Sequence, residues 1–260
     1  MLLASFIPGM LALLAATPPL VVAHRGYSSL APENTLVAYQ YAIEAGAPAA
    51  ECDVYCTSDG QVVLIHDGTV DRTTDGTGAI TAMTLEQVKQ LDAGSWKAGK
   101  FCGEKIPTLE ETLTLTKGRM RLVIEIKQAG IAQAVVDVLH KTEALSDVTI
   151  ISFSAETCRQ VRELEPSLPV GWLTGGCKED DADEADTIIR TALAANCQFI
   201  DVAWPGIKPA LLNRAQLAGM AIWAWTVDDP AAMHKLAELG VASITTNDVE
   251  AGMGAFAPEE

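Results

Sequence analysis

Short apolar runs and amphipathic stretches alternate along almost the whole chain, starting at Leu20. The apolar runs are rich in β-branched residues and lack polar alternation, which is typical of parallel strands buried on both faces. Strands that alternate with helices are joined by right-handed crossovers, so a parallel sheet covered by helices is expected. The 260 residues of the chain also suit one barrel of this kind, which needs about 250 residues. The sequence therefore predicts an α/β fold, a TIM-like (β/α)8 barrel over residues 20–260.

The expected strands cover residues 20–24, 48–54, 61–66, 120–126, 147–152, 168–173, 197–202, 220–225 and 241–245. The expected helices cover residues 33–45, 84–92, 108–117, 130–143, 154–165, 182–195, 208–218, 229–239 and 247–253. One connection differs, because the turn at Ser58-Asp59-Gly60 leaves no room for a helix before the strand at 61–66. That strand is either the third strand of the barrel or a segment that only flanks the barrel mouth.

Residues 68–107 interrupt the alternation directly after the strand that ends at His66. They begin with a stretch rich in Gly, Thr and Asp and continue through one short helix to Gly94-Ser95-Trp96. A long interruption at the carboxyl end of a strand is typical of a loop that shapes a binding site. We therefore expect a small inserted cap here.

The N-terminal segment, residues 1–19, is apolar and uncharged, and Pro8, Pro18 and Pro19 interrupt it. A secretory signal needs a basic start and a small-residue cleavage site, yet neither Lys nor Arg precedes Arg25. The segment is also too short and too broken for a membrane span. We expect a retained helix packed beneath the barrel, and hence a cytoplasmic protein. The alternative is export, with residues 1–16 as a signal peptide.

The charge of the chain excludes some partners. There are 34 Asp and Glu residues against 18 Lys and Arg, a formal charge of −16. Nucleic acid would be repelled, and a stable association with an anionic membrane is disfavoured for the same reason. The 6 cysteines form no Cys-x-x-Cys pair, which argues against a zinc site and favours small apolar fillers in a reduced compartment.

Two of the apolar runs end abruptly on histidine, at His24 and at His66. In α/β folds the carboxyl ends of the strands carry the active site. Imidazole can take up and release a proton near neutral pH, so both side chains are acid–base candidates. His140 and His234 lie in amphipathic stretches, and we interpret them as surface or structural residues.

Three carboxylates also occupy predicted strands. Glu51 and Asp53 are two residues apart and therefore share a face, while Glu125 lies in a separate run with Lys127 on its own face. An all-oxygen ligand set favours a hard cation, Mg²⁺ or Ca²⁺, over zinc. The alternative is that the acids are paired with Arg25 and Lys127, because a buried charge needs a partner.

Taken together, the ordered motifs resemble the glycerophosphodiester phosphodiesterase family. The resemblance covers roughly residues 20–250. It rests on His24-Arg25-Gly26, Pro32-Glu33-Asn34-Thr35, Glu51-x-Asp53, Asp59-Gly60, His66-Asp67, Asp71-Arg72-Thr73-Thr74, Asp92-Ala93-Gly94-Ser95-Trp96, Ile106-Pro107-Thr108-Leu109, Glu125-Ile126-Lys127 and Trp225-Thr226-Val227. Each motif alone is weakly specific, whereas the ordered set is strongly specific.

The resemblance implies metal-dependent hydrolysis of glycerophosphodiesters, such as glycerophosphocholine or glycerophosphoethanolamine, to glycerol 3-phosphate and an alcohol. In this scheme one histidine is the general base and the other the general acid, and we assign the base to His24 and the acid to His66. The expected metal ligands are Glu51, Asp53 and Glu125, holding one divalent cation.

Four further residues are expected to contact the substrate. Arg25 and Lys127 would clamp the phosphate, one as a planar fork and the other as a point charge. Asn34, next to Glu33 at the expected start of a helix, would hydrogen-bond within the site. Trp225 ends its strand near the mouth and would floor the pocket of the leaving alcohol. The protein itself is expected to be a monomer or a homodimer.

Three alternatives remain open from the sequence. The same fold could cleave lysophospholipids in a lysophospholipase D reaction, although no apolar slot for an acyl chain is evident. Lys127 could be a Schiff-base lysine of an aldolase-type barrel, which would leave the two histidines unexplained. The chain could also be a catalytically silent domain that only holds a metal.

Overall fold

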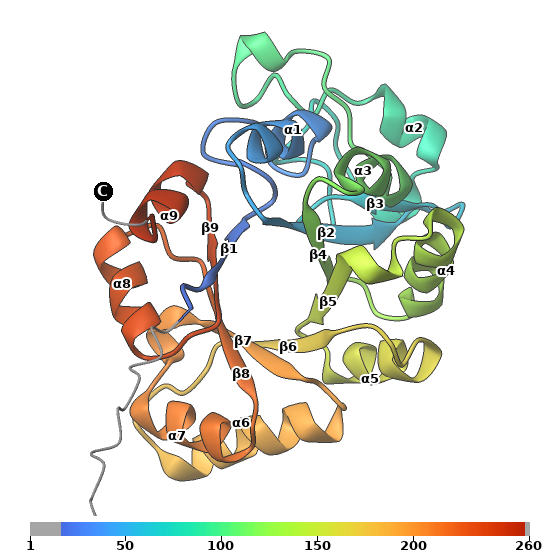
Figure 1. Cartoon of the computed structure of the whole chain (residues 1–260). Helices are drawn as coiled ribbons and strands as arrows, with labels where there is room; N and C mark the ends of the chain where they lie inside the picture. The colour runs from blue at the N-terminus through green and yellow to red at the C-terminus, as the bar shows by residue number, and fades with distance from the viewer. Residues whose placement is uncertain (1–16, 258–260) are drawn as a thin grey trace, which may run out of the picture.

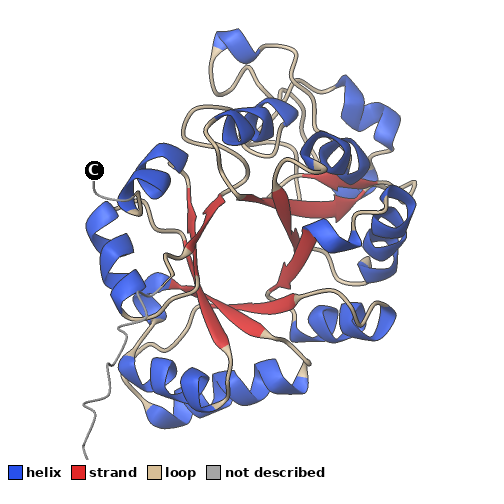
Figure 2. Ribbon diagram, in the orientation of Figure 1, coloured by secondary structure: helices blue, strands red, loops and turns tan. Residues whose placement is uncertain are grey.

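The structure, a computed structural model, describes residues 17–257. Within these residues nine strands form one sheet, and all of them except β3 run parallel and close into a barrel surrounded by helices (Figures 1 and 2). The barrel strands are β1 (Leu20–Ala23), β2 (Ala49–Cys56), β4 (Arg121–Ile126), β5 (Val148–Ser152), β6 (Val170–Thr174), β7 (Phe199–Ala203), β8 (Ala221–Trp225) and β9 (Ser243–Thr246). Pairing of β1 with β2 closes the circle, which confirms the predicted TIM-like (β/α)8 fold.

The outer layer is built from helices that follow the barrel strands. These are α1 (Leu36–Glu44), α3 (Leu109–Thr116), α4 (Ala132–Thr142), α5 (Ala155–Leu164), α6 (Ala182–Ala194), α7 (Pro209–Leu217), α8 (Pro230–Glu238) and α9 (Val249–Ala255). Short 3-10 helices lie at Ile80–Ala82, Gly99–Phe101, Leu145–Asp147 and Trp204–Gly206, and α2 (Leu85–Gln90) lies between the first two. Each predicted helix is present, with its ends displaced by a few residues.

The strand β3 (Val62–Leu64) lies outside the barrel. It pairs antiparallel with β2 only, because the short turn after Cys56 can join two strands only as a hairpin. Of the two interpretations of residues 61–66, the third barrel strand is therefore wrong and the flanking position is right. The barrel passes directly from β2 to β4.

The segment between β3 and α3 contains α2 and packs around a small apolar core of its own, made of Val63, Ile65, Val70, Ile80, Val88, Ala93 and Ile106. Its two ends lie side by side, because Val63 and Thr108 form an antiparallel bridge and the Leu64 amide donates to the Pro107 carbonyl at 2.9 Å. In Figure 1 it extends from one side of the barrel, above α1 and α3.

The helix predicted from residue 33 begins later than expected. Thr35 is the N-cap of α1 and accepts a hydrogen bond from the Ala38 amide, while Asn34 has a left-handed backbone with φ 56°. Glu33 and Asn34 therefore precede the helix. The left-handed turn directs the Asn34 side chain toward β2, where it bonds to Asp53.

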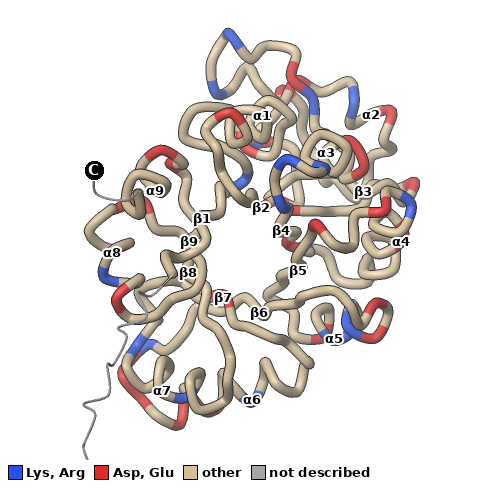
Figure 3. The backbone as a smooth tube through the Cα atoms, in the orientation of Figure 1, with Lys and Arg blue, Asp and Glu red and all other residues tan. Residues whose placement is uncertain are grey.

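Apolar packing fills two layers. A large core lies between the strands and the outer helices, and a smaller one fills the barrel interior, with Val22, Val123, Ile151, Leu173 and Phe199 among its members. Figure 3 shows most Lys, Arg, Asp and Glu positions on the helices and loops, with few of them along the strands. All six cysteines are free thiols, and only Cys102 is exposed, consistent with their predicted role as apolar fillers.

The predicted helix at residues 1–19 falls almost entirely outside the described residues. Within residues 17–257 no helix combines the length and the apolar composition that a bilayer crossing requires.

Candidate active site

A cavity of about 200 Å³ opens where the barrel strands end. One side of it, which we call the charged wall, carries His24, Arg25, Glu51, His66, Glu125 and Lys127. The remaining arc, which we call the apolar wall, carries Ile151, Phe153, Leu173 and Trp225. Eight of the nine residues predicted to form the site lie in or against this cavity: the six of the charged wall, Trp225, and Asp53 beside them. Asn34 is the exception.

His24 follows β1 and is held by a residue from the far end of the chain. Its Nδ1 lies 2.7 Å from Asn247 Oδ1. The Asn247 amide nitrogen donates to Asp228 Oδ2 at 2.7 Å, so the amide oxygen faces the ring and accepts the Nδ1 proton. Burial lowers the pKa of His24 to about 4. The ring is therefore neutral near pH 7, with an unprotonated Nε2 that lies 4.0 Å from Glu51 Oε2.

His66 follows β3 and is oriented by its own neighbour. Its Nδ1 lies 2.6 Å from Asp67 Oδ1, and Arg72 Nε donates to the second oxygen of the same carboxylate at 2.6 Å. The hydrogen bond from Arg72 lowers the pKa of Asp67 to about 2. Because a carboxylate can only accept, the His66 Nδ1 carries a proton in this contact. The opposite ring edge is free to act in the cavity.

The three carboxylates come together as predicted. Asp53 and Glu125 are direct neighbours on β2 and β4, and Glu51 shares the inward face of β2. One oxygen from each lies within 4.8 Å of the others, an arrangement that could hold a metal ion. Glu51 Oε1 and Asp53 Oδ1 are buried and have no hydrogen-bond partner among the described residues. Two buried acceptor oxygens of this kind are what a cation would satisfy.

Burial and mutual repulsion disfavour the charged forms of these acids. Burial, and then the charge of Asp53, raise the pKa of Glu51 well above its usual range. The same two causes raise the pKa of Glu125 to about 7. A divalent cation between the three groups would reverse this effect by favouring the ionised carboxylates.

Two cations flank the carboxylates. Arg25 has a left-handed backbone (φ 56°), so its amide donates to Glu51 Oε2 at 2.9 Å while its guanidinium lies 3.3 Å from Asp53 Oδ2. Lys127 Nζ lies 3.0 Å from Glu125 Oε1 and 3.5 Å from Asp53 Oδ1. Burial alone would lower the pKa of Lys127, but Asp53 and Glu125 raise it. A Schiff-base lysine needs the opposite shift, so the aldolase alternative loses its support.

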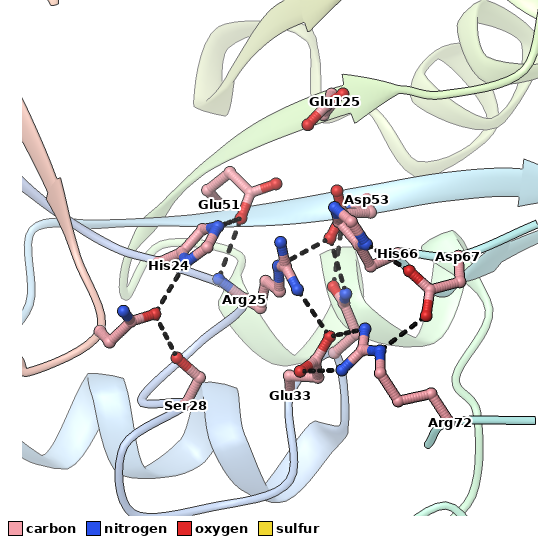
Figure 4. Close-up of polar contacts among 12 residues, drawn as sticks. His24, Arg25, Ser28, Glu33, Glu51, Asp53, His66, Asp67, Arg72 and Glu125 are labelled. Atoms are coloured by element: carbon pink, nitrogen blue, oxygen red, sulfur yellow. Dashed lines mark hydrogen bonds and ion pairs between the residues drawn. The ribbon is translucent and has the colours of Figure 1, made fainter. Parts of the chain in front are cut away.

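Arg72 joins the inserted segment to the charged wall. Besides its contact to Asp67, its two terminal nitrogens donate to both oxygens of Glu33, each at 2.8 Å. Glu33 in turn accepts from Arg25 at 2.8 Å. Figure 4 shows the resulting chain of contacts, with Glu33 between the two arginines. Although burial opposes it, Arg72 and Arg25 lower the pKa of Glu33 to about 2. The Arg72 guanidinium thus holds both Asp67, the partner of His66, and Glu33, the partner of Arg25.

Asn34 makes hydrogen bonds within the site without reaching the cavity. It does not line the cavity, and its amide nitrogen donates to Asp53 Oδ2 at 2.8 Å. Its amide oxygen accepts from the Tyr39 hydroxyl at 3.0 Å and from the Asp53 amide at 3.2 Å. With both ends of the side chain engaged in this way, Asn34 is placed to orient Asp53.

The apolar wall contains Trp225 where the sequence predicts it. Its indole nitrogen donates to the Asp201 carbonyl at 3.1 Å, and its ring meets that of Phe153 edge to face with centroids 5.6 Å apart. Phe153 is 50% exposed and stands at the cavity mouth. Asp201, Thr226 and Thr245 also line the cavity, and Asp201 is the acidic residue that lies outside the charged wall.

Four residues at this site had no role assigned from the sequence: Arg72, Phe153, Asp201 and Asn247. Each carries a signal in the sequence. Arg72 belongs to one of the ordered motifs, Phe153 continues the inward face of β5, and Asp201 interrupts an apolar strand. Asn247 directly follows β9, where the carboxyl ends of barrel strands build active sites.

A β/α barrel that gathers two histidines, three carboxylates and two cations in one cavity has the form of an enzyme acting on a phosphate ester. Comparison with known proteins agrees. The glycerophosphoryl diester phosphodiesterase family matches residues 24–251. A glycerophosphodiester phosphodiesterase of Caldanaerobacter subterraneus is 37% identical over 238 residues, covering 89% of this chain and 95% of that one.

Two further relatives support the assignment. A glycerophosphodiester phosphodiesterase of Bacillus subtilis is 32% identical, with 88% of this chain and 83% of the relative covered. The structure of an Oleispira antarctica phosphodiesterase, in complex with the product sn-glycerol-3-phosphate, superposes with a TM-score of 0.85 at 28% identity. That comparison covers 92% of this chain and 96% of the other. The chain belongs to the glycerophosphoryl diester phosphodiesterase family and is a phosphodiesterase.

Proposed function

We propose that this enzyme hydrolyses deacylated phospholipids, such as glycerophosphocholine or glycerophosphoethanolamine, to glycerol 3-phosphate and the free alcohol. The observation that carries the proposal is the charged wall, which together with Asp53 brings two histidines, two cations and three carboxylates into one site. The glycerol 3-phosphate bound by the Oleispira relative supports the same product. The cavity of about 200 Å³ suits a small substrate.

The residues present fit a divalent cation. Glu51, Asp53 and Glu125 would hold it. Glu51 Oε1 and Asp53 Oδ1, which lack a hydrogen-bond partner among the described residues, are the observation that supports this fit. Oxygen-only ligands favour Mg²⁺ or Ca²⁺. When bound, such an ion supplies positive charge that stabilises the phosphate oxygens in the transition state.

The side chains of the charged wall can bind and orient the substrate. Arg25 and Lys127 lie on either side of Asp53, so a phosphate placed between them would meet two fixed positive charges. The same charges would stabilise the negative charge that develops on the phosphate oxygens. Trp225 would contact the leaving alcohol.

His24 and His66 would move the protons. The neutral His24 has its free lone pair on Nε2 and would take the proton of the glycerol 2-hydroxyl as the oxygen–phosphorus bond forms. His66 would give a proton from the ring edge that faces the cavity to the alcohol oxygen as the other phosphorus–oxygen bond breaks. Water then opens the cyclic 1,2-phosphate with the two histidines in exchanged roles. Intramolecular attack is favoured, with effective molarities that reach about 10⁵ M or more.

A substrate screen tests the reaction. Phosphate release would be measured by coupling a phosphatase to the glycerol 3-phosphate formed from glycerophosphocholine, -ethanolamine, -glycerol and -inositol with Mg²⁺ and with Ca²⁺. We expect turnover of at least one of these diesters. Turnover of lysophosphatidylcholine alone would instead favour the lysophospholipase D reaction.

A 2-deoxy analogue of glycerophosphocholine tests the cyclic route, because only that route needs a free 2-hydroxyl. We expect the analogue to bind and to be cleaved about 10²-fold more slowly or worse, within the range of about 10²–10⁴ for lost acid–base catalysis. A comparable rate would identify water as the direct nucleophile.

The remaining assignments belong to the same proposal. Residues 20–260 act as one catalytic unit in which the small insertion at 68–107 shapes the cavity mouth, and the enzyme works in the cytoplasm as a monomer or homodimer. Mass spectrometry of the native protein checks the cytoplasmic location, because a mature start near Thr17 would indicate export.

A further inference from the structure

The carboxyl group of Asp201 is an unpaired polar group inside an apolar environment. Asp201 lies in the middle of β7 and is 1% exposed. Its Oδ1 has no hydrogen-bond partner, and no described residue donates to either carboxyl oxygen or forms an ion pair with it. A buried polar group without a partner costs about 1–3 kcal/mol. Because the unpaired carboxyl of Asp201 lowers the stability of the fold, a role in ligand binding is the kind of explanation it requires.

The surroundings of Asp201 leave only the cavity as a place for its partner. Leu173 on β6 and Trp223 on β8 are its register neighbours, and both are apolar. Phe199 precedes it on the same inward face and stacks on Trp223 with centroids 4.1 Å apart, which closes the barrel interior on that side. The cavity is the open side, and Asp201 is part of its lining.

The missing partner is a hydrogen-bond donor without charge. Burial, with Glu125 as a second cause, raises the pKa of the Asp201 carboxyl well above its usual value. An uncharged carboxyl is a poor partner for an ammonium group and a good partner for a hydroxyl, which can both donate and accept. A cationic head group would meet Phe153 at the exposed mouth instead.

Two hydroxyls are available on a glycerophosphodiester, and only one remains for Asp201. The 2-hydroxyl has to lie beside phosphorus on the charged wall. The terminal hydroxyl is one carbon further away and can reach across the cavity to the other arc. We propose that Asp201 binds this terminal hydroxyl and so restricts the enzyme to substrates in which it is free. This inference rests on the proposed function.

A consequence concerns acylated substrates. In a 1-acyl lysophospholipid the terminal oxygen is esterified, so it has no hydrogen to donate and carries a chain toward the closed side of the cavity. The Asp201 carboxyl would then stay unpaired in the complex, which a binding site penalises strongly. Asp201 is thus a specificity-determining residue that separates deacylated from acylated phosphodiesters.

The test compares glycerophosphocholine with the phosphocholine diester of propane-1,2-diol, which keeps the 2-hydroxyl and lacks only the terminal one. The ratio of kcat/KM for the two substrates would be measured for the native enzyme, Asp201→Asn and Asp201→Leu. Thr149→Val is the matched control, because Thr149 is buried on β5 and does not line the cavity.

We expect the native enzyme to prefer the glycerol substrate by about 10²-fold or more, since a site built to bond a hydroxyl rejects an analogue without it. In Asp201→Leu the ratio of the two kcat/KM values falls to within about fivefold of unity, because the hydrogen bond that distinguishes the two substrates is lost. Asp201→Asn keeps part of the preference, because its amide oxygen still accepts, and Thr149→Val keeps all of it. A native ratio near unity, or an unchanged ratio in Asp201→Leu, overturns the inference.

A binding measurement separates this inference from the proposed function. Calorimetry would compare glycerol 3-phosphate with propane-1,2-diol 1-phosphate, which needs no turnover. Tighter binding of glycerol 3-phosphate that disappears in Asp201→Leu supports the hydroxyl contact even if no diester of the screen is cleaved. Equal binding of the two phosphates to the native protein contradicts it, even if glycerophosphocholine is a good substrate.

Discussion

The two walls of the cavity are built on the same barrel by opposite means. On the charged wall, β1, β2 and β4 end in side chains that hydrogen-bond or pair with one another, and Glu33 and Arg72 add a second layer of contacts behind them. On the apolar wall, Ile151, Leu173 and Trp225 pack without charge, and Asp201 is left unpaired.

The difference teaches where each kind of specificity is placed. Charges that must act together are assembled on neighbouring strands, where each reduces the desolvation cost of the next. Groups that select between similar substrates stand alone in apolar surroundings, where the loss of one hydrogen bond is most costly. Four experiments test this contrast, from the largest expected effect to the smallest.

Removal of any one of the three clustered carboxylates should have the largest effect. Glu51→Ala, Asp53→Ala and Glu125→Ala should each abolish measurable turnover, while the fold stays intact or becomes more stable because repulsion between buried acids is relieved. Activity assays and urea unfolding check both parts. The control is Glu238→Ala, an exposed acid at the end of α8. Full activity after exhaustive chelation would show that no metal is needed.

Arg72→Lys should reduce kcat by about 10–100-fold, because a small displacement of groups around the site can cost about 10²-fold. A lysine cannot reproduce the fork that bonds both oxygens of Glu33 and also reaches Asp67. Arg159→Lys is the matched control, since Arg159 also bonds both oxygens of a glutamate, Glu156, but on the exposed face of α5. Equal activity of the two variants would mean that the Arg72 contacts are only structural.

Asp201→Asn should stabilise the protein at neutral pH. The raised folded-state pKa means that the folded protein keeps a proton which the unfolded chain has lost above the ordinary value of 3.8. The contribution of this carboxyl to the free energy of unfolding is therefore fully present below pH 3.8. It is lost as pH rises through the folded-state pKa. The variant has no such loss, so its gain should grow between about pH 5 and about pH 8. The gain should reach about 1–3 kcal/mol.

Urea unfolding of both proteins at the two pH values measures this gain. A difference that does not change with pH would show that Asp201 has the same pKa in the folded and the unfolded chain.

Phe153→Leu should have the smallest effect. Its ring is half exposed and meets Trp225 edge to face, a contact worth about 0.5–1.5 kcal/mol. We expect KM for glycerophosphocholine to rise by less than about tenfold, with kcat unchanged. Steady-state kinetics with glycerophosphocholine and with glycerophosphoglycerol checks this result. A large loss of kcat would place Phe153 among the groups that act in the chemical step.

The barrel and the charged wall could be predicted from the sequence because their signals are local. An apolar run that ends on His24 predicts a buried strand and the residue at its carboxyl end. The two-residue spacing of Glu51 and Asp53 predicts that both side chains lie on the same face of a strand. The partners of these residues are not local. Asn247 orients His24 from 223 residues away, and no sequence pattern specifies such a distance.

The position of β3 could not be predicted for a related reason. Its apolar residues would suit the barrel as well as a flanking hairpin, and the direct parallel pairing of β2 with β4 decides between them. The role of Asp201 was also hidden, since one acid in an apolar strand is equally consistent with a buried ion pair. Its lack of a partner is a property of the packed structure.

The inserted segment leaves and rejoins the barrel at one point, where Val63 bridges Thr108. Because its ends are already joined, it can be lengthened, shortened or exchanged with that of a relative at little cost in loop-closure entropy. Arg72 is the constraint on any such exchange, since it ties the segment to Glu33 and Asp67. Grafted segments that keep an arginine at the position of Arg72 should therefore yield active chimaeric enzymes whose cavity mouth differs. The segment can thus be exchanged between relatives as one unit.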